Sequence, residues 1–157
     1  FNLDAAKTIE LNHGNLIGLQ ASFETSDGQS HTIADVWFHT QAGGNQSLDL
    51  TQLNAAVVGK LGAIDLASDN GEATSLTVDA KAVAQLGQAG QVDLGNGAAA
   101  PVQMIINGDQ NDSVHIQGAT GEWQAAGTAT IDGTSYNVYN EGDVQLLVAT
   151  DVHTWIN

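Results

Sequence analysis

Cysteine and arginine are absent from this 157-residue sequence, and proline occurs once. Without cysteine the chain cannot contain disulfides or Cys-ligated zinc. Its positive charges are three lysines, which face 18 acidic residues and leave a formal net charge of −15. Because proteins bind nucleic acid and anionic lipid through lysine and arginine, we expect no nucleic acid and no membrane among its partners. Calcium is the natural counterion for such a surface, and solubility alone is the simpler explanation of the charge.

Long apolar runs are also missing, so no segment resembles a signal peptide or a membrane span. The chain opens at Phe1 without methionine, and we expect it to be part of a longer secreted protein. Hydrophobic residues make up 42% of the chain, enough for one packed core. We therefore expect one module over residues 1–157, with a candidate subdivision into an N-terminal hairpin region, 1–44, and the remainder, 45–157.

Alternating polar and apolar residues predict short strands along the chain. The first hairpin is expected to turn at Asp27-Gly28, with a returning strand over 29–38. Further strands are predicted at 48–50, 63–66, 75–78, 104–106 and 114–116, and an antiparallel meander over 128–149 turns at Asp132-Gly133 and 141–143. The predicted fold class is all-β: a β-sandwich or a short parallel β-solenoid with a C-terminal antiparallel meander. Periodicity does not separate the sandwich from the solenoid.

Two short helices are predicted among these strands. One spans about 51–58 and ends at Gly59. The other has Asp79 as its N-cap, buries Val83 and Leu86, and ends at Gly87. Both are too short to form a helical layer.

Two acidic turns are candidate calcium sites. Asp109, Asn111 and Asp112 place three oxygen-bearing side chains on one turn after a strand, which is the chemistry that a calcium site requires. A second, weaker candidate consists of Asp65, Asp69 and Asn70. Neither turn has the EF-hand spacing, so any calcium is expected to be shared between loops that folding brings together. The alternative for both turns is that the side chains stabilise the turns themselves.

The predicted returning strand of the first hairpin carries a candidate ligand-binding surface. Asp35, Trp37 and His39 alternate along it, so they share one face and offer an aromatic ring beside polar groups, suited to a glycan or a peptide. The alternative is that Trp37 packs beneath a neighbouring strand. Trp123 and Trp155 are expected to be core or packing residues, since both lie near apolar strands.

No enzymatic motif is present. The sequence lacks a Gly-x-Ser-x-Gly elbow, a phosphate-binding loop and a dinucleotide fingerprint, and its five histidines have no zinc-site spacing. Paired carboxylates remain open because aspartate is frequent. We expect that the protein is not an enzyme.

The segment Leu48–Val152, about two thirds of the chain, resembles the region beside the calcium-binding repeats of giant RTX adhesins. The segments that carry the resemblance are Ala63–Leu66, Ile106–Val114, Trp123, Gly127–Tyr139 and Val144–Val148. Residues 108–114 form one degenerate copy of the RTX nonapeptide, with Gln110 at a glycine position. Members of the family are exported by type I secretion from Gram-negative bacteria, carry a C-terminal export signal, and support adhesion and biofilm formation.

The resemblance implies an extracellular, cell-surface module that binds calcium and has a structural role, with neighbouring modules of the same giant chain as partners. The alternative is a module of the same kind of adhesin that binds a cell-surface glycan or peptide. As a fragment, the chain is expected to be monomeric.

Overall fold

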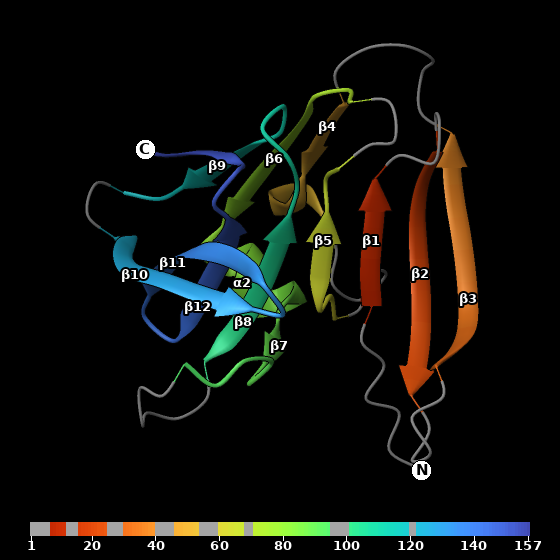
Figure 1. Ribbon diagram of the computed structural model, residues 1–157, viewed down its shortest axis with the longest axis horizontal. Helices are drawn as coiled ribbons and strands as arrows, with labels where there is room; N and C mark the ends of the chain where they lie inside the picture. The colour runs from red at the N-terminus through yellow and green to blue at the C-terminus, as the bar shows by residue number, and fades with distance from the viewer. Residues whose placement is uncertain are drawn as a thin grey trace.

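The computed structural model describes residues 7–11, 16–24, 30–39, 46–53, 60–67, 71–94, 101–119 and 122–157, with the backbone alone for 7–39 (Figure 1). Most of these residues lie in strands, and the strands form two sheets. One α-helix and one 3-10 helix accompany them within these ranges. No helix in this part of the chain is long and apolar enough to cross a membrane.

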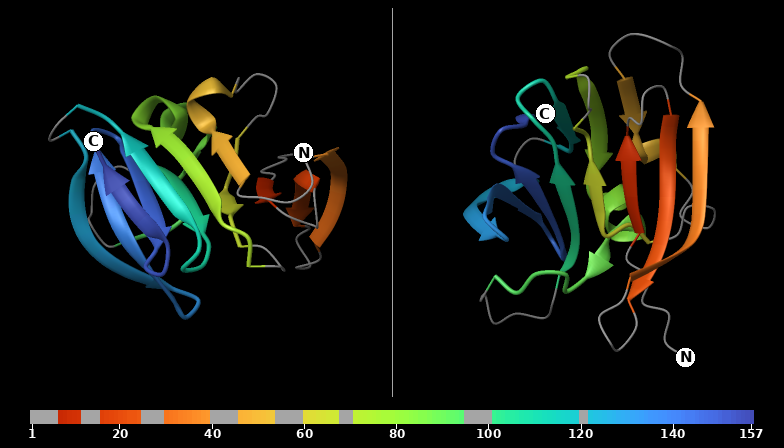
Figure 2. Two further views of the ribbon diagram at one scale, coloured as in Figure 1. Left: turned by 90° about the horizontal axis from the view of Figure 1, so that it is seen from above. Right: turned by 45° about the vertical axis from the view of Figure 1, so that its right-hand side comes forward.

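The larger sheet has nine strands and mixed orientation. In spatial order it contains β10 (Gln124–Ile131), β11 (Thr134–Glu141), β12 (Val144–Ala149), β8 (Val102–Asn107), β5 (Ala63–Asp65), β1 (Lys7–Leu11), β2 (Leu16–Glu24) and β3 (Ser30–His39), with β7 (Gln88–Ala89) paired to β8. The four central strands β12, β8, β5 and β1 are mutually parallel, and the outer pairs are antiparallel. In Figure 2 the red and orange strands β1 to β3 lie at one end of the molecule and the blue C-terminal strands at the other.

The smaller sheet has four strands, all parallel. Their order is β13 (His153–Ile156), β9 (Ser113–Gln117), β6 (Thr74–Asp79) and β4 (Gln46–Asp49). The chain alternates between the two sheets. Strands β5, β8 and β12 of the larger sheet are followed in the chain by β6, β9 and β13 of the smaller one, respectively. Equivalent turns therefore lie side by side, as the hydrogen bond from Leu66 N–H to the Asn107 carbonyl (2.9 Å) illustrates.

Both sheets contribute to one hydrophobic core. Alternate residues of β6 and β9 are buried, including Leu76, Val78, Val114 and Ile116, as a strand with one covered face requires. Met104 and Ile106 of the larger sheet belong to the same cluster. Each fully buried aliphatic side chain of this kind contributes about 1.5–3 kcal/mol.

Strand β12 differs from these strands because all six of its residues are buried. It lies between β8 and β11, and its Gln145 is in register with Gln103 of β8. The Gln103 Nε2 donates to Gln145 Oε1 (2.7 Å) and to the Val92 carbonyl (2.9 Å), and Gln145 Nε2 donates to Asn140 Oδ1 (2.9 Å). The two glutamines are 1% and 3% exposed, and this network satisfies their amides.

The predicted second helix is confirmed. Helix α2 (Ala80–Leu86) begins at Asp79, whose Oδ1 accepts a hydrogen bond from Ala82 N–H (2.6 Å), and it buries Val83 and Leu86. Gly87 ends the helix where a Cβ atom would lie 2.7 Å from the Gln103 carbonyl, so backbone contact requires glycine there. The first predicted helix is replaced, where the structure describes it, by the 3-10 helix η1 (Leu50–Gln52), and residues 54–59 lie outside the described ranges.

The C-terminal meander is also confirmed, with antiparallel pairing of β10, β11 and β12. Asp132 and Gly133 have φ values of 49° and 88°, the positive values that a tight type I′ hairpin turn needs at both central positions. The β2–β3 hairpin is confirmed as an antiparallel pair, while residues 25–29 of its predicted turn are outside the described ranges.

Candidate functional site

The turn between β8 and β9 is organised by the Asp112 carboxylate. This side chain is 0% exposed, and both of its oxygens accept hydrogen bonds from backbone N–H groups. Its Oδ1 binds Thr74 N–H (3.0 Å), at the start of β6, and its Oδ2 binds Asp109 N–H (2.8 Å). The Asp112 backbone binds a further strand, because its carbonyl accepts a hydrogen bond from His153 N–H (3.0 Å) at the start of β13. Asp112 therefore joins three consecutive strands of the four-stranded sheet.

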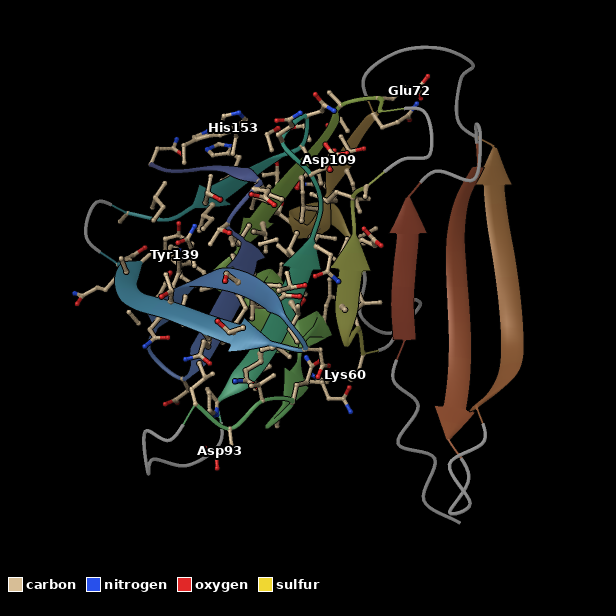
Figure 3. The ribbon with its side chains drawn as sticks, in the orientation of Figure 1. Lys60, Glu72, Asp93, Asp109, Tyr139 and His153 are labelled. Carbon is tan, nitrogen blue, oxygen red and sulfur yellow. The ribbon has the colours of Figure 1, made fainter. Side chains whose placement is uncertain are left out.

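Asp109 and Asn111, on the same turn, have a local role in the described structure. The Asp109 Oδ1 accepts from Asn111 N–H (2.8 Å), which is an Asx-turn, and the Asp109 carbonyl accepts from Asp112 N–H (3.0 Å). Figure 3 labels Asp109 on this turn. These bonds are the turn chemistry that was the alternative to a metal site.

The β5 turn lies beside the β8 turn. Asp65, the last residue of β5, is in register with Asn107 of β8, and its Oδ1 accepts from Ala67 N–H (3.1 Å). Asn107 Oδ1 in turn accepts a hydrogen bond from the Tyr136 hydroxyl (2.6 Å). Asp65 and the β8–β9 turn, which belong to the two candidate calcium sites, are thus brought to one end of the stacked strands.

The electrostatics of this acidic end follow from burial and from its carboxylates. Burial raises the pKa of Asp112; the N–H groups of Asp109 and Thr74 lower it, and the negative charges of Asp109 and Asp65 raise it further. Burial likewise raises the pKa of Tyr136, with a contribution from the charges of Asp132 and Asp65. The raised Asp112 pKa therefore reflects burial first, and the negative charges of Asp109 and Asp65 add to it.

Gly108 allows the close packing of this end. A Cβ atom at Gly108 would lie 2.8 Å from Asp112 Oδ2 and 2.8 Å from Val152 Cγ2. Only glycine lets the β8 backbone approach the buried carboxylate this closely.

The structure describes four of the six predicted calcium ligands. Asp65, Asp109, Asn111 and Asp112 come to the same end of the molecule, whereas Asp69 and Asn70 lie outside the described residues. Within the described ranges, no group of three or more His, Cys, Asp or Glu side chains has the arrangement to hold a metal ion. Both carboxylate oxygens of Asp112 accept hydrogen bonds from backbone N–H groups. The described side-chain hydrogen bonds of Asp65 and Asp109 each use one carboxylate oxygen.

The predicted ligand surface lies on β3, at the end of the nine-stranded sheet. Asp35, Trp37 and His39 are paired with Gln20, Gly18 and Leu16 of β2. Their strand is as predicted, but their side chains are outside the described part of the structure, so ligand binding there stays a prediction.

The four-stranded sheet carries an exposed aromatic group that the sequence did not reveal. Trp155 is 46% exposed, so of the two predicted roles, core or packing, it has the packing role and is not a core residue. Its ring stacks on His115 of β9, with centroids 5.3 Å apart and planes inclined by 18°, and His115 Nε2 is hydrogen-bonded to Asn157 Oδ1. Trp123, by contrast, is 5% exposed and donates from Nε1 to the Gln117 carbonyl (3.2 Å), as expected of a core residue. The sequence could not show that His115 and Trp155 lie in register, because the paired positions of β9 and β13 are 40 residues apart.

A polar cavity of about 300 Å³ lies beside the β10 bulge, lined by Glu122, Gln124, Ala125, Ala126, Asn140 and Gly142. Next to it in sequence, Glu141 has a buried Oε2 without a hydrogen-bond partner, and burial followed by the charges of Glu122 and Asp79 raises its pKa. Glu122 is the one carboxylate among the residues that line the cavity, so the lining does not form the paired-carboxylate arrangement that the sequence left open.

Comparison with known proteins finds no matching family model, no matching curated protein and no matching solved structure.

Proposed function

We propose that this chain is an extracellular, non-catalytic structural module of a large bacterial surface adhesin of the RTX type, stabilised by calcium at its acidic end. The observation that carries the proposal is the meeting of Asp65 with the Asp109–Asp112 turn, where the charges of Asp109 and Asp65 act together on Asp112. A divalent cation bound by the oxygens of Asp65 and Asp109 would relieve this repulsion. The acidic balance of 18 carboxylates against three lysines supports the same reading.

The strand topology supports a structural role. The regular passage from β5 to β6, β8 to β9 and β12 to β13, with parallel register in both sheets, is typical of a short parallel β-solenoid. Such an arrangement stacks equivalent turns, and in the proposed module the acidic turns of successive coils would share ions. Secretion into a calcium-rich exterior would then couple folding to export.

Thermal unfolding tests the calcium part of the proposal. The chain would be melted with excess chelator and then with millimolar calcium, and we expect the melting temperature to rise by several degrees, because a ligand that binds only the native state stabilises it. Asp109→Asn and Asp65→Asn should each reduce the rise, whereas Asp143→Asn, at an exposed position in the β11–β12 turn, should leave it unchanged. An equal melting temperature in chelator and calcium would refute the calcium site.

Ligand binding through Asp35, Trp37 and His39 is the second candidate function. What supports it is the position of β3, whose far side has no further strand among those described. A glycan array and a peptide library would be screened with the whole chain, and Trp37→Ala should abolish any binding found. If both screens are empty while calcium raises the melting temperature, the structural role alone remains.

A further inference from the structure

Two rows of residues cross five neighbouring strands of the nine-stranded sheet, from β3 through β2, β1 and β5 to β8 (Figure 1). Directly paired residues of adjacent strands lie on the same face of a sheet, whereas successive residues of one strand lie on opposite faces. The register therefore assigns each row to one face. The first row consists of Val36, Leu19, Ile9, Ile64 and Ile106. Its members Ile64 and Ile106 are fully buried, so this row is on the core side of the sheet.

The second row, the outer row, lies on the opposite face of the same five strands. It consists of Trp37, Gly18, Glu10, Asp65 and Asn107. Neighbouring strands are about 4.8 Å apart, so the outer row extends over about 19 Å. The register thus places the candidate ligand surface on β3 in one line with Asp65 at the acidic end, although the two are far apart in the sequence.

An aromatic residue lies at each end of this line. Tyr136 is paired with Ala149 of β12, the strand between β8 and β11, and its hydroxyl donates across that strand to Asn107 Oδ1 (2.6 Å). At the other end, Gly18 separates Trp37 from Glu10 and contributes no side chain. Aromatic rings beside polar groups suit a ligand that has flat faces and hydrogen-bonding groups.

The polar middle of the outer row requires hydrogen-bond donors from a ligand. Glu10 and Asp65 are directly paired, and like charges in register oppose each other. Their ionised carboxylates can only accept hydrogen bonds. The described hydrogen bonds use Oδ1 of Asp65 and Oδ1 of Asn107, so Asp65 Oδ2 and Asn107 Nδ2 remain for a ligand.

The charge of the face indicates the sign of the ligand. Asp35 lies two residues before Trp37 on β3, so it adds a third carboxylate to the same face. The three lysines of the chain lie elsewhere: Lys7 is on the core-side face with Ile9, Lys60 donates to a carbonyl of helix α2 (3.2 Å), and Lys81 belongs to that helix. Such a face repels anionic ligands and is complementary to cationic ones.

We propose that the outer row binds an oligosaccharide that carries free amino groups. A sugar ring would stack on Trp37 over the space left by Gly18, ammonium groups would pair with Glu10 and Asp65, and Asn107 would donate to a ring hydroxyl. The inference rests on the second candidate function, ligand binding through Asp35, Trp37 and His39, and adds the ligand class and the further residues that bind it. It does not require the calcium site.

Isothermal titration calorimetry of the whole chain tests this ligand class. The probe is a linear glucosamine hexamer, titrated in chelator under mildly acidic conditions in which its amines are protonated. The matched probes are the fully N-acetylated hexamer, which has the same rings without the charges, and hexalysine, which has the charges without the rings. We expect the glucosamine hexamer to bind about tenfold or more tightly than either, because it combines ring stacking with charge pairing.

Variants along the outer row test the site itself. Trp37→Ala removes the stacking ring and should weaken binding by about tenfold or more. Gly18→Thr fills the gap between Trp37 and Glu10 with a residue that strands favour, so the variant should fold and bind at least about tenfold more weakly. Glu10→Gln removes one charge and should weaken binding by about threefold. Asp143→Asn, an equal loss of charge at an exposed position in the β11–β12 turn, should bind as the parent does.

Three results would overturn the inference: no heat of binding with millimolar glucosamine hexamer on the folded chain, equal affinity for the N-acetylated hexamer or for hexalysine, and unchanged affinity in both Gly18→Thr and Glu10→Gln. If Trp37→Ala alone weakens binding, the ligand surface on β3 stands and the outer row does not. The calcium-stabilised role is decided separately by the melting temperature, since the titration is done in chelator.

Discussion

Asp112 accepts a hydrogen bond from the backbone N–H of Thr74, 38 residues earlier in the chain, at a distance of 3.0 Å. The same carboxylate holds Asp109 N–H through its other oxygen. One buried side chain therefore joins the β8–β9 turn to the beginning of β6. This role predicts that the residue stabilises the fold independently of any ion.

Replacement of Asp112 tests that role. Asp112→Ala leaves the N–H groups of Thr74 and Asp109 without their acceptor, at a cost of about 1–3 kcal/mol for each buried group. Urea unfolding should show a correspondingly lower free energy of unfolding, in chelator as well as in calcium. Asp151→Ala, at an exposed position on the neighbouring turn, should change it by less than about 0.5 kcal/mol. A loss that appears only in calcium would contradict the structural role.

The raised pKa of Asp112 predicts an unusual pH dependence. The folded state binds this proton more tightly than the unfolded state does, so the contribution is fully present below the unfolded pKa and is lost as pH rises through the raised folded pKa. The free energy of unfolding should therefore gain from Asp112 as pH falls from 7 toward about 4. Asp112→Asn cannot titrate and should show a smaller gain, measured by urea unfolding at several pH values. An identical slope in both proteins would show that Asp112 has no part in it.

Glu141 should also make the fold more stable as the pH falls, for the same reason as Asp112. Its pKa is raised by burial and by Glu122 and Asp79, and its Oε2 has no hydrogen-bond partner. Glu141→Gln removes this charge, and we expect it to raise the free energy of unfolding at pH 7 by up to about 1 kcal/mol, because the site is partly solvated. The gain should disappear near pH 4. Destabilisation at pH 7 would indicate that the charge is compensated.

Gly108→Ala should destabilise the fold by about 1–3 kcal/mol, because its new Cβ atom would meet Asp112 Oδ2 and Val152 Cγ2. Val152 is buried, so Val152→Ala alone should also cost stability. The double variant relieves one of the two contacts. The double variant should therefore lose less stability than the two single variants lose together. Losses that simply add would show that the contact with Val152 does not matter.

Trp123 and Trp155 differ in their predicted contribution to stability. Trp123→Ala removes a buried ring and its hydrogen bond to the Gln117 carbonyl, and it should cost about 3–5 kcal/mol. Trp155→Ala removes a half-exposed ring that stacks on His115, and it should cost less than about 1.5 kcal/mol. Chemical denaturation of both variants provides the comparison. Equal losses would mean that Trp155 is packed more tightly than its exposure indicates.

Local patterns were sufficient for much of the secondary structure. The alternation in 128–149 predicted the C-terminal meander, and Asp79 followed by Val83, Leu86 and Gly87 predicted helix α2 with its caps. These features depend on residues close together in sequence, whose conformational preferences act before any tertiary contact forms. The turn chemistry of Asp109 and Asn111 belongs to the same class.

Tertiary structure decided the roles of residues whose partners are distant in sequence. The carboxylate of Asp112 is buried because β6, β9 and β13 meet around it, and Trp155 is exposed because β13 is the last strand of its sheet. The sequence by itself determined an acidic, cysteine-free, β-rich chain and most of its turns. Burial, register and strand order depend on pairing across dozens of residues, and the free energy of that pairing is not contained in any local pattern.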